Sequence, residues 1–103
     1  MPEWIDRLNL RLLGGHPIPL PIRLVVDGVS YRVEGQGLSL EQAPDPDVPV
    51  RGTLRISADD LVRVLDGIKI GRLLLLLPRI KTEGFSAEDL TSLIGWLKTF
   101  SSR

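Results

Sequence analysis

The feature that most constrains the fold is a pair of β-rich runs separated by Asp27-Gly28. Residues 22–26 (Ile-Arg-Leu-Val-Val) and 29–33 (Val-Ser-Tyr-Arg-Val) are rich in β-branched and aromatic side chains. Asp-Gly readily adopts the positive φ angles of a type I′ turn, whose twist matches that of the flanking strands. The pattern therefore predicts a β-hairpin in which each strand buries one face.

Further strands are expected on both sides of a proline-rich segment. Residues 38–41 favour a third strand, and residues 43–49 favour a surface loop. Residues 50–56 alternate again, with Val50, Leu54 and Ile56 on one side. We expect these four strands to form an antiparallel meander, and residues 79–83 to form a short, half-exposed strand.

Two helices are predicted from their capping residues. Ser57 and Ser86 each precede an acidic first turn, which suits the positive end of the helix dipole. The first helix should end at Gly67 and the second at about Phe100. Residues 4–13 fit either a strand or a helix, and we favour a short amphipathic helix. The alternating prolines of residues 16–21 predict a stiff, extended connector.

The sequence carries more apolar side chains than one small sheet needs. The segment from Ile70 to Leu77 is apolar on every side, so we expect it to be buried and to end at Pro78. In the last helix, Trp96 and Phe100 widen an apolar stripe formed by Leu90, Leu93, Ile94 and Leu97. This surplus is compatible with a dense core, a hydrophobic cavity or a patch that meets a partner.

Composition excludes several classes of function. The 103 residues suit a single domain, and 13 basic residues balance 13 acidic ones, which gives no electrostatic basis for a nucleic-acid partner. There is no cysteine, and the first residues do not resemble a signal peptide. The longest apolar run, Leu73 to Leu77, is far below the roughly 18 residues of a membrane span. We expect a cytoplasmic protein without integral membrane association.

No motif in the sequence favours catalysis or metal binding. His16 is the only histidine, and no sequence neighbour would orient it as a general base. Asp45 and Asp47 lack the other ligands of a calcium loop, and Gly35-Gln36-Gly37 lacks the third glycine of a dinucleotide loop. We therefore expect a protein that is not an enzyme, with no catalytic residue, no metal site and no cofactor.

From Ile22 to Trp96 the order of these features resembles the sterol-carrier-protein (type 2) family of small lipid-binding domains. The resemblance rests on the hairpin of residues 22–33, on the strand and capped helix of residues 53–67 with Ser57-Ala58-Asp59-Asp60-Leu61, and on the apolar segment, strand and closing helix that follow. It implies an α+β fold with a curved, mainly antiparallel sheet of about five strands and helices packed on one face. Residues 1–103 would form one such domain, with an abbreviated N-terminal helical segment at about residues 4–13.

The resemblance also implies a function and a site. Family members hold lipids in an apolar tunnel between sheet and helices, so this chain would be a non-catalytic binding or carrier domain for a lipid-like apolar ligand. The alternative is a protein-interaction or accessory module whose apolar helix face, with Trp96 and Phe100, meets a partner protein or a second copy in a homodimer. Because the N-terminal helical segment is short, the tunnel would be either collapsed, open at one end or closed by a second subunit. The implied lipid-binding residues are Leu65, Ile68, Leu73, Leu76, Leu77, Leu93, Trp96, Leu97 and Phe100.

Overall fold

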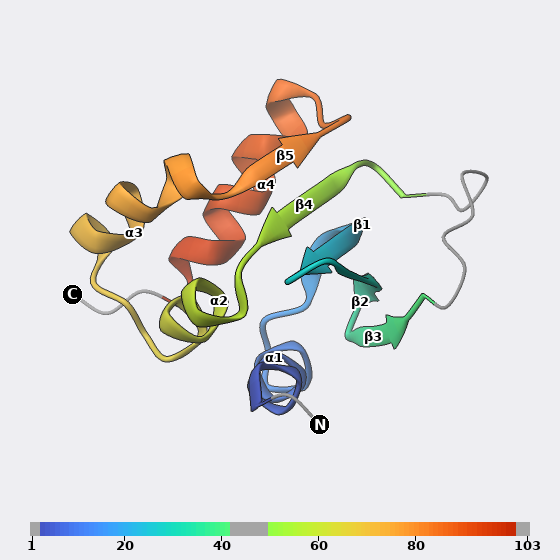
Figure 1. The fold of residues 1–103 in the computed structure, drawn as a ribbon, viewed down its shortest axis with the longest axis horizontal. Helices are drawn as coiled ribbons and strands as arrows, with labels where there is room; N and C mark the ends of the chain where they lie inside the picture. Colours follow the sequence, from blue (N-terminus) through green and yellow to red (C-terminus); the bar gives the residue numbers. More distant parts are fainter. Residues whose placement is uncertain (1–2, 42–49, 101–103) are drawn as a thin grey trace.

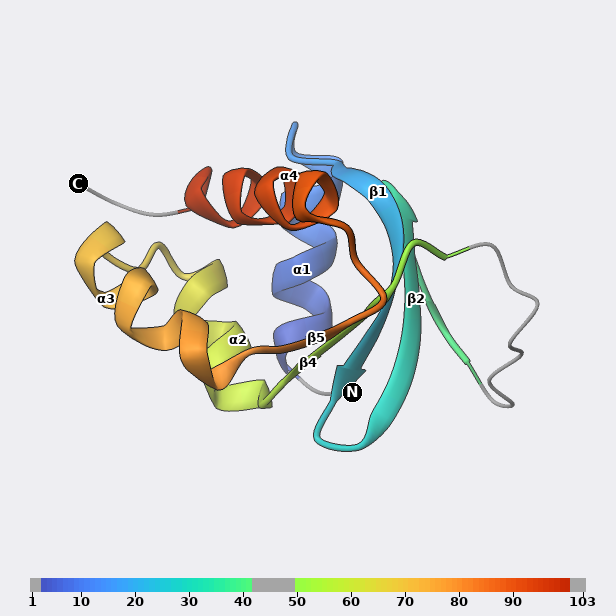
Figure 2. The ribbon, with the colours of Figure 1, turned by 90° about the horizontal axis from the view of Figure 1, so that it is seen from above.

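The structure, a computed structural model, describes residues 3–41 and 50–100. A five-stranded sheet in the order β3-β2-β1-β4-β5 is curved, and Figure 2 shows the helices on one side of it. This architecture confirms the predicted α+β fold, and three of the four strand pairs in the described residues are antiparallel. The elements, labelled in Figure 1, are α1 (Glu3–Leu13), β1 (Ile18–Val26), β2 (Val29–Gly35), β3 (Gly37–Leu40), β4 (Thr53–Ile56), α2 (Ala58–Leu65), α3 (Ile70–Leu76), the 3-10 turn η1 (Leu77–Arg79), β5 (Lys81–Glu83) and α4 (Ala87–Lys98).

The predicted hairpin is the centre of the sheet. Asp27 and Gly28 have φ angles of 50° and 85°, as a type I′ turn requires, and Val26 pairs with Val29. One face of both strands is buried in the core, although Val29 beside the turn is exposed. The hairpin and the third strand are therefore confirmed, and they form a three-stranded antiparallel meander.

The prediction of a four-stranded meander is wrong. The fourth strand, β4, lies on the other side of β1 and runs parallel to it, with Leu24 opposite Leu54 and Val26 opposite Ile56. A strand with alternating apolar residues buries the same side chains whether it runs parallel or antiparallel to its neighbour. Its own pattern therefore does not reveal which strand it pairs with. Pairing with β1 brings Leu54 and Ile56 into the core beside the buried side chains of the hairpin.

The extended connector predicted for residues 16–21 is also shorter than expected, because β1 already begins at Ile18. Ile18 pairs with Gly35 and Ile22 pairs with Val33, so the register shifts across the residues between them. Pro19 and Pro21 occupy this stretch and have no backbone N–H to donate, which is consistent with an interrupted ladder. The loop predicted for residues 43–49, with Asp45 and Asp47, lies outside the described residues.

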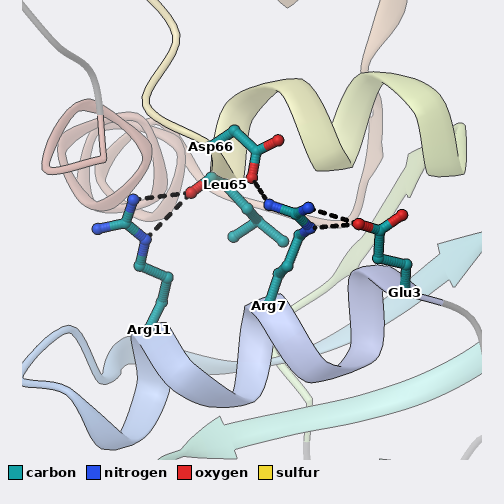
Figure 3. A network of polar contacts seen from close by, with 5 residues as sticks. All are labelled: Glu3, Arg7, Arg11, Leu65 and Asp66. Atoms are coloured by element: carbon teal, nitrogen blue, oxygen red, sulfur yellow. Dashed lines mark hydrogen bonds and ion pairs between the residues drawn. The ribbon is translucent and has the colours of Figure 1, made fainter.

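The N-terminal segment is the predicted helix, α1. Its apolar stripe of Trp4, Leu8 and Leu12 is buried, and the ring of Trp4 meets Tyr31 of the hairpin edge-on at 4.8 Å. Figure 3 shows the polar contacts that join α1 to α2. Arg7 bridges Glu3 and Asp66, and Arg11 donates two hydrogen bonds, of 3.1 and 2.7 Å, to the carbonyl oxygen of Leu65.

The expectation that the whole apolar segment is buried is wrong for α3. Leu73 and Leu76 are buried, whereas Leu74 and Leu75 are 53% and 78% exposed. Both ribbon views place α3 at the outer end of the molecule, away from the hairpin, so the core receives one side of this helix (Figures 1 and 2). The helix ends as predicted, since Pro78 lies in the 3-10 turn that follows.

Candidate functional site

A small apolar cavity of about 160 Å³, partly open to solvent, lies where α4 packs against the edge of the sheet and the η1 turn. All but one of its lining residues are leucine or isoleucine, and the exception is a threonine on β5. Such a cavity offers dispersion contacts and no charged group, so it suits a hydrocarbon rather than a polar ligand. The lining residues are Leu54, Leu77, Ile80, Thr82, Leu90, Leu93, Ile94 and Leu97.

The first turn of α4 fixes the cavity wall at one end. Ser86 caps the helix by accepting a hydrogen bond of 3.1 Å from the backbone N–H of Asp89, whose carboxylate accepts one of 3.3 Å from the backbone N–H of Ser86. Arg51, just before β4, donates a hydrogen bond of 3.0 Å to the same carboxylate. This bond from Arg51, more than those from Ser86, holds the pKa of Asp89 below its ordinary value, although burial opposes the shift. The cap therefore anchors α4 to the sheet.

Aromatic contacts fix the other end of α4. The indole N–H of Trp96 donates a hydrogen bond of 2.9 Å to the carbonyl oxygen of His16, and the rings of Trp96 and Phe100 meet edge-on at 5.0 Å. The His16 ring packs against Phe100 at 5.4 Å, and the guanidinium of Arg11 lies over the same ring. His16 and Trp96 thus take part in packing the end of α4 on the end of α1.

The structure divides the nine residues of the implied tunnel among three surroundings. Leu77, Leu93 and Leu97 line the apolar cavity. Ile68 and Leu76 line a wider, open groove of about 610 Å³ between α2 and α3. The others contribute to the hydrophobic core, with Trp96 only partly buried against it: Leu65, Leu73, Trp96 and Phe100.

Sequence reasoning missed five residues that line the cavity. Leu54 was expected to face inward from its strand, and Leu90 and Ile94 were assigned to the stripe that packs on the sheet. The sequence predicts Ile80 and Thr82 in a half-exposed strand over residues 79–83 and gives them no role. The structure corrects this strand, because β5 begins only at Lys81 and all three of its residues are exposed. The helical spacing of Leu90, Leu93, Ile94 and Leu97 was the available indication, but it does not distinguish a filled interface from a partly empty one.

Within the described residues the structure contains no group of three or more acidic or histidine side chains that could hold a metal ion. In the same residues, no helix has both the length and the apolar character needed to cross a bilayer.

An open mixed sheet covered on one face by helices, with an apolar cavity beneath the last helix, defines the class of fold. No family model matches the chain, and no curated protein matches its sequence. Among solved structures, it is similar to the sterol carrier protein domain 2 of Helicoverpa armigera, with a TM-score of 0.65 and 14% sequence identity over 98% of this chain and 87% of that chain. The chain therefore has the fold of a sterol carrier protein domain.

Proposed function

We propose that this chain is a non-catalytic domain that binds or carries a lipid-like apolar ligand between α4 and the sheet. The observation that carries the proposal is the apolar cavity lined by β4, η1, β5 and α4. The likeness in fold to a sterol carrier protein domain supports it.

The size of the cavity limits what it accepts without rearrangement. An apolar protein cavity of about 150 Å³ binds a molecule the size of benzene, and the cavity here is about 160 Å³. It therefore accommodates the end of an acyl chain. A longer ligand would extend along Leu73, Leu76, Trp96 and Phe100, which belong to the same hydrophobic cluster. Its entry requires these side chains of the core to move.

The experiment compares two matched substitutions. Ile94 is a partly buried residue of α4 that lines the cavity, and Ile5 is a partly buried residue of α1 that packs on the same core. Ile94→Phe should fill the cavity and reduce uptake of a fluorescent fatty acid at least tenfold, whereas Ile5→Phe should retain it. Equal uptake by the two folded variants would contradict the proposed site.

The second candidate function is an interaction module, and the exposed leucines of α3 favour it. Of the two aromatic residues expected to meet a partner, Phe100 is buried in the core, and Trp96 is partly buried with its indole N–H bonded to the carbonyl oxygen of His16. A dimer in sedimentation that Leu74→Ser and Leu75→Ser together dissociate would support this candidate.

A further inference from the structure

The outer side of α3 combines exposed leucines with a cluster of arginines. Leu74 and Leu75 project from the middle of the helix, and Leu75 lines the open groove between α2 and α3 together with Arg63, Arg72 and Arg79. We call these five residues the α3 surface. We propose that the α3 surface docks on a lipid bilayer containing anionic phospholipids. This inference stands on observations separate from the cavity and goes beyond ligand binding.

The charge around α3 is locally positive although the whole chain is neutral. Residues 67–82 include two lysines and two arginines and no acidic residue. The exposed carboxylate of Asp59 precedes Arg63 by four residues on α2, and two further carboxylates at α2 are already engaged. Asp60 is buried and forms an ion pair of 3.3 Å with Arg79, and Asp66, which lines the groove together with the arginines, pairs with Arg7 of α1. In the part of the chain that the structure describes, no carboxylate forms an ion pair with Arg63 or Arg72, and both are exposed.

This arrangement fits a bilayer surface better than another apolar partner. Leucines on the outer side of a helix can enter the boundary between headgroups and acyl chains while neighbouring arginines stay among the headgroups. Guanidinium groups bind phosphate in a bidentate manner, so the exposed Arg63 and Arg72 of this open groove suit phospholipid headgroups, whereas Arg79 is already paired with Asp60. An apolar protein surface would leave Arg63 and Arg72 buried without a counter-charge, which is unfavourable.

The position of the α3 surface also connects it with the cavity. The η1 turn follows α3 directly, and its first residue, Leu77, lines the apolar cavity. A bilayer docked on α3 would therefore lie next to the η1 turn, which forms part of the cavity wall. Docking itself does not depend on the ligand, so vesicles alone suffice to test it.

The test measures co-sedimentation of the whole chain with phosphatidylcholine vesicles, with and without phosphatidylserine. We expect binding to the vesicles that contain phosphatidylserine and its loss at high salt. Arg63→Gln with Arg72→Gln should weaken binding about 30-fold, because each basic residue near the membrane surface contributes roughly five- to sixfold. The control, Arg32→Gln with Arg55→Gln, removes two basic residues of the sheet and should bind as the unmodified chain does.

The apolar contribution has its own matched pair. Leu74→Ser with Leu75→Ser should weaken binding at least tenfold, whereas Leu10→Ser with Leu13→Ser should not, although these leucines of α1 are also 72% and 68% exposed. All four side chains lie outside the core, so circular dichroism should show the same helix content in each variant.

Equal binding to both kinds of vesicle, or equal binding by the α3 variants and their controls, would overturn the proposal. Absence of vesicle binding together with a dimer that depends on Leu74 and Leu75 would also overturn it and assign the surface to self-association. Uptake of a fatty acid from solution by the α3 variants separates this proposal from the proposed function. We expect that uptake to be unchanged.

Discussion

Leu93 and Leu73 offer a direct energetic test of the apolar cavity. Both leucines lie within helices and are almost fully buried, with exposed fractions of 2% and 0%. Leu93 lines the cavity, whereas Leu73 packs in the core and lines none of the cavities described above. Substitution by alanine removes the same three carbon atoms at each position and introduces the same helix-forming residue, so the difference between the two costs reports on packing.

The expected magnitudes follow from the surroundings. Leucine-to-alanine substitutions in a protein core cost about 2.7 to 5 kcal/mol, and the cost depends on how closely the original side chain was packed and how well the site collapses. We expect Leu73→Ala near the upper end of this range. Leu93 already faces empty space on one side and loses fewer contacts, so Leu93→Ala should cost about 1 to 2 kcal/mol less.

Urea denaturation measures this difference. With an m-value of about 2 kcal/mol per molar urea, the midpoint of Leu93→Ala should lie roughly 0.5 to 1 M above that of Leu73→Ala. The comparison is valid where both variants unfold in a single transition with equal slopes. Equal costs, or a larger cost at Leu93, would mean that side chains fill the cavity in solution and would refute the reasoning.

Two further predictions concern the elements that frame the cavity. Because the folded-state pKa of Asp89 is lowered, its carboxylate stabilises the fold above its unfolded pKa of about 3.9, and this contribution is lost as pH falls through the lower folded value. Asp89→Asn should therefore flatten the decline of the urea midpoint below about pH 4. An unchanged decline would contradict the role of the cap. At Gly52, a Cβ atom would approach the carbonyl oxygen of Glu83 to 2.5 Å and the ring of Phe85 to 2.8 Å, so Gly52→Ala should cost about 1 to 3 kcal/mol in thermal denaturation. Gly95→Ala, where a Cβ meets no atom within 4 Å, should instead stabilise α4 by about 0.5 to 1 kcal/mol. A change in stability of the same sign for both substitutions would contradict this packing.

The elements that the sequence predicted well depend on local chemistry. The turn at Asp27-Gly28 and the caps at Ser57 and Ser86 involve residues within a few positions of one another, so the local sequence is enough to indicate their geometry. The short N-terminal helix was favoured over a strand because Trp4, Ile5, Leu8 and Leu12 share one helical face. The structure buries three of these residues and buries Ile5 in part.

The features that it predicted poorly depend on distant partners. The alternation of Leu54 and Ile56 does not reveal that their strand pairs with β1 in parallel rather than extending the meander. Likewise, the run of leucines in α3 shows that the helix is apolar but not how many of its sides pack against the core. Leu73 is buried in the core, whereas Leu75 is exposed.

The candidate site has the same limitation. The stripe containing Leu93 and Leu97 was predicted from helical spacing, and the structure places both residues beside the sheet. Whether such an interface is filled depends on the shapes of side chains contributed by four elements, which no local pattern specifies.

Native mass spectrometry of the gently purified chain tests the central claim most directly. If the chain carries an apolar ligand, the spectrum should show extra mass of several hundred daltons that organic solvent releases, and Ile94→Phe should lack it. A bare mass for the unmodified chain, together with no uptake of added fatty acid, would contradict the proposed function.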